Sequence, residues 1–170
     1  MKDSLVKALN DQFNREYYSS YLYLSMSAYA VALGYKGAAN WLSVQAREEA
    51  AHGAHICRHL LNRGAAPSFQ TVKAPPDSFG GIKELFEKVL AHEKSVTEAV
   101  DRIACLALEE KDHATYSFIQ WYVNEQVEEE ADAEELLVKF SRIGDNPGLL
   151  YTLDAQLAAR RFTDPFPEEA

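Results

Sequence analysis

The sequence predicts an all-α fold, a bundle of four long helices followed by a short fifth helix. Two observations predict it: proline is absent from residues 1–66, and apolar residues recur every three or four positions without the alternation typical of strands. We treat residues 1–170 as one domain, because a chain of this length can bury a sizeable core. The expected helices span about 4–33, 38–63, 82–110, 114–143 and 149–161, followed by a loose tail over 162–170.

Segments rich in glycine, proline or polar residues mark the ends of these helices. Residues 34–37 (Gly-Tyr-Lys-Gly) separate the first two helices, and Gly64 follows a basic last turn as a C-cap. Three of the six prolines fall in residues 65–81, which we expect to be a loop. Short breaks at 111–113 and 144–148 separate the remaining helices.

The helix lengths and connections also predict a topology. Each main helix would be roughly 40 Å long at the usual rise per residue. The two short connections then produce antiparallel hairpins. An extended loop over 65–81 would reach roughly 50 Å, enough to cross the whole bundle. The sequence therefore predicts two hairpins joined by one long crossover.

Composition limits the classes of function. The formal charge is −9, from 26 acidic and 17 basic residues, which argues against nucleic acids and anionic membranes as partners. No apolar run reaches the ~20 residues of a membrane span, and the first residues lack the apolar stretch of a signal peptide. Only two cysteines are present, Cys57 and Cys105, so no disulfide framework is expected. We therefore expect a cytoplasmic protein.

Each main helix carries a heptad-like seam that should face the bundle interior. Near mid-helix every seam is interrupted by a carboxylate or another residue able to bind a metal. The seams are Leu9, Phe13, Glu16, Ser20 and Tyr23; Leu42, Gln45, Glu49, His52 and Ile56; Phe86, Val89, Glu93, Val96 and Val100; and Ile119, Tyr122, Gln126, Glu129 and Ala133.

These interruptions have the same register in both hairpins. Glu16 precedes Glu49 by 33 residues and His52 by 36. Glu93 precedes Gln126 by 33 residues and Glu129 by 36. Each hairpin therefore places one glutamate opposite a pair spaced three residues apart. Two such hairpins packed face to face would bring all six side chains together.

Four carboxylates inside a bundle need compensation, because an unpaired buried charge costs many kcal/mol. The four seams contain no lysine or arginine. Two divalent ions would balance four carboxylates, and an oxygen-rich ligand set with one imidazole favours iron or manganese over structural zinc. The alternative is that some of these glutamates lie on solvated helix faces, but the shared register on four helices argues against it.

At these residues the chain resembles the non-haem ferritins of bacteria and archaea. The helix motifs that carry the resemblance are NREYYSSYLYLSMSA, QAREEAAH, AHEK and FIQWYVNEQVEEE, and it covers about residues 1–161. Glu with Glu-x-x-His in a bundle core is the known pattern of ferritin-like di-iron proteins. The second pair here is Gln126-x-x-Glu129, the usual ferritin form, and not a second Glu-x-x-His.

The resemblance implies a role for each site residue. Glu16, Glu49 and His52 would bind a first iron, whereas Glu49, Glu93 and Glu129 would bind a second, with Glu49 bridging. Gln126 would lie close by, and Tyr23 would be a hydrogen-bonding or redox-active neighbour. A third iron site would use the acidic residues Glu48, Glu125, Glu128 and Glu129.

The resemblance also implies a function and partners. The chain would oxidise Fe(II) with dioxygen or hydrogen peroxide and store the ferric oxide inside a homo-oligomeric shell, which has 24 copies in this family. The apolar fifth helix supports assembly, because alone it would leave an exposed apolar patch.

Other interpretations fit the sequence less well. Haem-binding bacterioferritins need a methionine on the second helix, and this chain has Ala50 there and only Met1 and Met26 elsewhere, so no haem is expected. Rubrerythrin-type peroxidases usually carry Cys-x-x-Cys pairs, which are absent. A purely structural helical scaffold would leave the buried carboxylates unexplained. The small DNA-protecting ferritins lack this fifth helix and site pattern.

Overall fold

The computed structural model describes residues 1–167, which form five helices and, within that range, no strand. The helices are α1 (Asp3–Ala32), α2 (Lys36–Asn62), α3 (Ile82–Glu109), α4 (His113–Ile143) and α5 (Pro147–Leu157). The predicted all-α class, with four long helices and a short fifth, is confirmed. The ends of α1 to α4 lie within two residues of the expected ones.

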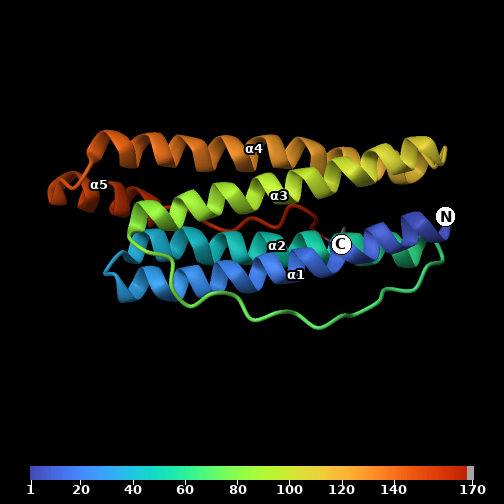
Figure 1. The fold of residues 1–170 in the computed structure, drawn as a ribbon, viewed down its shortest axis with the longest axis horizontal. Helices are drawn as coiled ribbons and strands as arrows, with labels where there is room; N and C mark the ends of the chain where they lie inside the picture. Colours follow the sequence, from blue (N-terminus) through green and yellow to red (C-terminus); the bar gives the residue numbers. More distant parts are fainter. Residues whose placement is uncertain (168–170) are drawn as a thin grey trace.

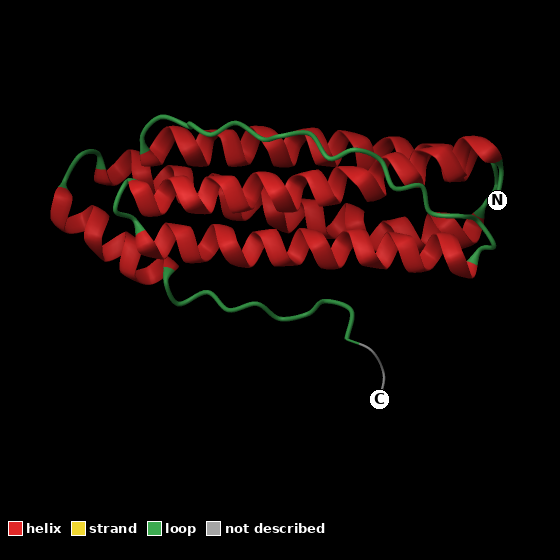
Figure 2. Cartoon of the chain, turned by 90° about the horizontal axis from the view of Figure 1, so that it is seen from below, coloured by secondary structure: helices red, strands yellow, loops and turns green. Residues whose placement is uncertain are grey.

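The four long helices form two antiparallel hairpins, α1 with α2 and α3 with α4, as the sequence predicts (Figure 1). The connection over 63–81 runs along the length of the bundle (Figure 2). Hydrogen bonds fix it to α1: Asn14 Nδ2 donates to the Ser68 carbonyl at 2.7 Å, and the Tyr29 hydroxyl donates to the Gly80 carbonyl at 2.8 Å. The predicted long crossover is therefore confirmed.

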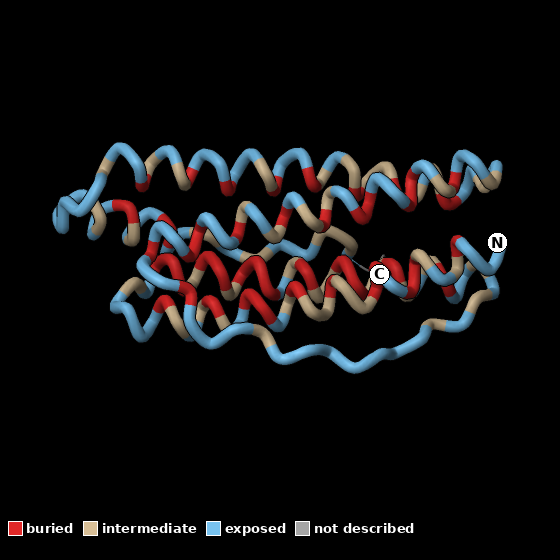
Figure 3. Tube along the Cα trace, viewed as in Figure 1, coloured by how far each residue is buried: buried red, intermediate tan, exposed pale blue. Residues whose placement is uncertain are grey.

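The apolar core has two parts, one toward each end of the bundle. One part contains Met26, Leu42 and Phe86, and the other contains Phe13 and Ile56. Buried residues form the inward faces of all four long helices (Figure 3). Along each long helix, the polar seam residues lie between the residues of the two apolar parts. The apolar core is therefore interrupted near its middle.

The seam residues are buried on all four helices, with one exception. Ser20 is only half-buried and donates to the Ala46 carbonyl at 2.7 Å, whereas the adjacent Ser19 is fully buried. The expected core position on α1 is therefore wrong by one residue. An α-helix has 3.6 residues per turn, so a strict pattern of steps of three and four gradually shifts around the helix. At this point the shift decides which of the two adjacent serines faces the core.

Helix α5 differs most from the expected range of 149–161. It begins at Pro147, whose fixed φ suits the first helical position, and the Asn146 side chain caps it by accepting from the Leu149 amide at 3.1 Å. It ends at Leu157. Beyond that point, the carbonyls of Ala158 and Arg160 accept hydrogen bonds from the Asn40 side chain of α2. Residues 158–161, which were expected to continue the helix, instead bind α2 through these hydrogen bonds.

Helix α5 packs against the beginning of α2. The Ala38 amide donates to Asp154 Oδ1 at 2.8 Å, and Leu153 and Leu157 are buried in the core. Gly37 allows this approach, because a Cβ at that position would overlap with the backbone carbonyl of Asp154. The first turn of α2 is thus shaped to receive α5.

The segment after α5 runs back toward the middle of the bundle (Figure 2). This segment was expected to be a loose tail. Instead, the ring centroid of Phe166 lies 3.6 Å from that of His55 on α2, in a stacked arrangement, and 4.4 Å from that of Trp121 on α4. Residues 168–170 of the expected tail lie outside the described residues. Among the described helices, none combines the length and apolar character that a membrane span needs.

Candidate metal centre

Six polar side chains with metal-binding atoms meet in the middle of the bundle. All six side chains are buried, with residue exposures between 1% and 6%. Helix α1 contributes one, α2 two, α3 one and α4 two, in the order Glu16, Glu49, His52, Glu93, Gln126 and Glu129. The matched register predicted from the two hairpins therefore does bring these six residues into one layer.

Glu16, Glu49 and His52 form the tightest group. Each offers one ligand atom, and these atoms all lie within 4.8 Å of one another. Across residues 1–167 this is the one cluster of three His, Cys, Asp or Glu residues with that spacing. Glu16 Oε2 and His52 Nε2 are buried and have no hydrogen-bond partner. Buried polar atoms are rarely left unpaired, so both atoms are free to bind a cation.

Two glutamine side chains orient the carboxylates of this layer. Gln12 Nε2 donates to Glu16 Oε1 at 2.7 Å, one turn along α1. Gln45 Nε2 donates to Glu129 Oε1 at 2.8 Å and to Glu49 Oε1 at 3.2 Å. A single amide group therefore connects the α2 and α4 carboxylates and brings them close together.

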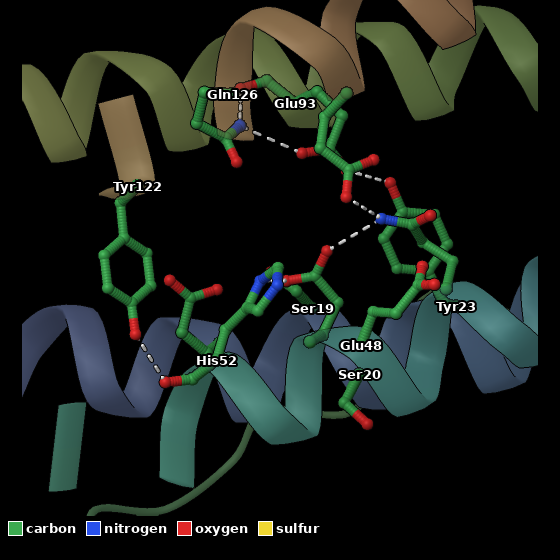
Figure 4. A network of polar contacts seen from close by, with 12 residues as sticks. Ser19, Ser20, Tyr23, Glu48, His52, Glu93, Tyr122 and Gln126 are labelled. Atoms are coloured by element: carbon green, nitrogen blue, oxygen red, sulfur yellow. Dashed lines mark hydrogen bonds and ion pairs between the residues drawn. The ribbon is translucent and has the colours of Figure 1, made fainter. Parts of the chain in front are cut away.

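Glu93 is held from two sides. The Tyr23 hydroxyl donates to Glu93 Oε1, and Gln126 Nε2 donates to Glu93 Oε2 at 3.2 Å (Figure 4). Tyr23 is fully buried on α1, so it reaches across the bundle to α3. Gln126 thus directs its nitrogen at Glu93, which leaves its oxygen as the atom that could face a cation.

Burial of this layer disfavours charge on its carboxylates. Burial, with a smaller effect of nearby Glu93, raises the pKa of Glu16 to about 7. Burial also raises the pKa of Glu49 and Glu129 well above the usual value, and the charge of Glu93 reinforces both shifts. Within the described part of the chain, no lysine or arginine forms an ion pair with these carboxylates. The site therefore lacks positive charge, which bound cations would supply.

His52 is suited to metal binding as a neutral imidazole. Burial and, to a smaller extent, the neighbouring His55 lower its pKa to about 3. Its ring lies edge-on to Trp121 at 5.2 Å, and its backbone carbonyl accepts from the Tyr122 hydroxyl at 2.9 Å. These contacts hold the ring in place, whereas Nε2 stays unpartnered.

The other predicted acidic residues lie at the edge of this layer. Glu48 and Glu125 are half-buried, and Glu128 is exposed. Burial and the charges of Glu128 and Glu48 raise the pKa of Glu125, but the predicted third group is not gathered to ligand spacing. Instead, Glu48 forms an ion pair with Arg160.

Three residues with direct roles in this layer were not identified from the sequence as functional. Gln12 and Gln45 each lie four residues before a site glutamate, and that i, i+4 spacing is a signal that could have indicated them. Arg160 lies within the expected fifth helix, but α5 ends at Leu157, and no local signal in the sequence places this side chain near the site.

Comparison with known proteins identifies the family. A profile described as the ferritin-like domain matches residues 6–143. A bacterial non-heme ferritin of Staphylococcus epidermidis is 40% identical over 164 residues, covering 96% of this chain and 99% of that protein. The corresponding protein of Staphylococcus aureus is 39% identical over the same coverage.

Solved structures agree. An open-pore ferritin from the archaeon Archaeoglobus fulgidus superposes with a TM-score of 0.93 at 41% identity, covering 95% of this chain and 98% of that one. A humanized archaeal ferritin gives a TM-score of 0.95 at 42% identity, covering 96% of this chain and 99% of that one. The chain therefore belongs to the ferritin family, in its non-haem bacterial and archaeal branch.

Proposed function

We propose that this iron-storage ferritin subunit oxidises Fe(II) at the buried carboxylate layer. Glu16, Glu49 and His52 bind one ferrous ion in this proposal. Glu93 and Glu129 bind a second ion together with Glu49, which lies between the two groups and bridges them. The observation that carries the proposal is the pair of unpartnered atoms, Glu16 Oε2 and His52 Nε2, inside a buried cluster of carboxylates without a basic partner in the described residues.

The reaction is a two-electron transfer between substrates. Two Fe(II) ions each give up one electron, and dioxygen takes both with two protons to form hydrogen peroxide. When peroxide is the oxidant, the same two electrons and two protons produce two water molecules. Hard carboxylate oxygens favour the ferric products over the ferrous ions, which lowers the driving force that the oxidant must supply.

Tyr23 and Gln126 complete the site without being charged ligands. The Tyr23 hydroxyl orients Glu93 by donating to it and would be a hydrogen-bonding or redox-active neighbour of the iron pair. Gln126 fixes the other oxygen of Glu93 and leaves its own carbonyl available beside the second iron.

A third iron site forms part of the proposal, at Glu48, Glu125, Glu128 and Glu129. Support for it comes from the half-buried position of Glu48 and Glu125 next to the layer and from the charges of Glu128 and Glu48, which together with burial raise the pKa of Glu125. We propose no haem, because position 50 is alanine and Met26 is buried in the apolar core. A cytoplasmic location is also proposed, on the basis of the free thiols of Cys57 and Cys105.

Storage requires a shell, and we propose a homo-oligomer with 24 copies as in the family. Helix α5 buries Leu153 and Leu157 against its own subunit but exposes Leu149 and Tyr151. Val127 on α4 is exposed as well. Such apolar side chains are covered when subunits associate.

Aerobic addition of ferrous iron to the purified apo-protein tests this function. We expect ferric absorbance to develop faster than in buffer alone and to end in soluble particles that contain iron, measured by absorbance and by particle size. Iron that precipitates at the rate seen in buffer would overturn the proposal.

A further inference from the structure

The end of the α5 segment delivers a positive charge to the edge of the carboxylate layer. The Arg160 guanidinium donates to Glu48 Oε2 through one nitrogen and to Gln45 Oε1 through the other at 2.8 Å. The two partners lie on α2, within four residues of Glu49. Arg160 therefore contacts the layer from outside while belonging to a segment that follows α5.

The contact with Gln45 reaches the site itself. Because Arg160 donates to the oxygen of this amide, the nitrogen must point the other way, where it donates to Glu129 and Glu49. An uninterrupted chain of hydrogen bonds thus leads from Arg160 to two of the carboxylates proposed to bind iron.

Several contacts hold Arg160 in place. Its guanidinium lies 4.4 Å from the Trp41 ring centre, a cation–π distance. Its backbone carbonyl accepts from Asn40 Nδ2 at 3.0 Å. Its side chain and that of Glu48 are 22% and 18% exposed, so the ion pair is largely shielded from water. The position of Arg160 is therefore set by the docking of α5 on α2.

Glu48 belongs to the proposed third site, and its Oε2 atom already accepts a hydrogen bond from Arg160. Glu48 Oε2 cannot be fully available both to a guanidinium and to a metal ion. After burial, the charges of Glu128, Glu48 and Asp132 raise the pKa of Glu125, so this acidic edge would attract either positive charge. Arg160 and a third cation are therefore alternative partners for the same carboxylate.

We propose that Arg160 is a positioning residue that holds Glu48 and so limits binding of a third cation beside the iron pair. This inference rests on the proposed function, since it assumes that a third cation uses Glu48. When the third cation binds, Arg160 leaves Glu48, and the segment that follows α5 loosens from α2. The C-terminal segment is thereby coupled to the metal content of the site.

The first test counts redox-inert cations in the assembled apo-protein. Zinc titrations followed by calorimetry should give two tight ions per chain and a weaker third in the parent. Arg160→Gln removes the competing charge, so the third zinc should bind about fivefold more tightly or better, with the two tight ions retained. Arg160→Lys keeps the charge beside Glu48 and should restore binding close to that of the parent.

A second readout follows the segment itself by hydrogen exchange over residues 158–167. In the parent, saturation of the third site with zinc should increase exchange there. In Arg160→Gln, exchange should already be high and should not respond to zinc. This measurement separates displacement of Arg160 from a general loss of stability.

Arg161→Gln is the matched control. It makes the same change of charge at the next residue, but among residues 1–167 the Arg161 guanidinium donates hydrogen bonds only to the carbonyls of Ala158 and Arg160. An equal effect of the two variants on the third zinc, or no effect of Arg160→Gln, would overturn the inference. Absence of the two tight ions from the parent would instead overturn the proposed function.

Discussion

Replacing Glu49 with alanine is expected to slow the oxidation of ferrous iron by at least about 100-fold, the loss typical when the binding of a metal is disrupted. The ligand atoms of Glu49, Glu16 and His52 lie within 4.8 Å of one another. Glu49 and Glu129 both accept a hydrogen bond from the Gln45 amide. Its removal therefore affects both proposed iron positions at once. Stopped-flow measurement of ferric absorbance on the assembled protein gives the rate.

Two further variants make this result interpretable. Glu98→Ala removes an exposed glutamate of α3 whose one ion pair in the described part of the chain is with Arg102, and it should leave the rate unchanged. Glu49→Gln keeps the shape of the side chain without its charge. Its apo form should be at least as stable to heat as the parent, because a buried carboxylate with like-charged neighbours costs stability. A fast rate in Glu49→Ala would contradict the assigned role.

Replacing Gly37 with alanine is expected to have the largest effect on the fold and the assembly. The new Cβ would overlap with the Asp154 carbonyl, which belongs to backbone and cannot move aside by a change of rotamer. We expect α5 to separate from α2, with loss of the Ala38–Asp154 hydrogen bond and exposure of Leu153. The free energy of unfolding should fall by about 2 kcal/mol or more.

Hydrogen exchange over 147–157 and sedimentation measure these effects. Exchange in α5 should rise, and the shell should dissociate or become smaller. Gly148→Ala is the control on α5 itself, because its Cβ would meet its nearest neighbour, Asn146 Oδ1, at an ordinary 3.5 Å. Normal protection of α5 in Gly37→Ala would contradict the docking geometry described above.

The carboxylate layer could be predicted because two independent patterns coincide in it. Helical periodicity places Glu16, Glu49, Glu93 and Glu129 on inward faces, and the equal spacing in the two hairpins places them at one level. The same periodicity placed Ser20 in the core where Ser19 is buried. The heptad-like pattern and the true helical repeat differ there by less than one residue, which is enough to exchange two adjacent serines.

Contacts made by irregular segments could not be predicted in this way. Arg160 meets Gln45 and Glu48 only because α5 docks on α2 and because Asn40 binds the carbonyls that follow it. Those contacts join residues more than 100 positions apart, and they depend on packing that no local pattern describes. Phe166 is a similar case, since its contact with His55 arises from the return of the chain along the bundle.

We propose that the carboxylate layer binds two iron ions side by side. Anomalous diffraction at the iron edge, from crystals of the assembled protein loaded with ferrous iron under anaerobic conditions, tests it most directly. We predict two peaks about 3.5–4 Å apart, a typical two-metal spacing. One should lie against Glu16, Glu49 and His52, and the other against Glu49, Glu93 and Glu129. Iron bound elsewhere on the chain, with no peak inside the bundle, would contradict the account.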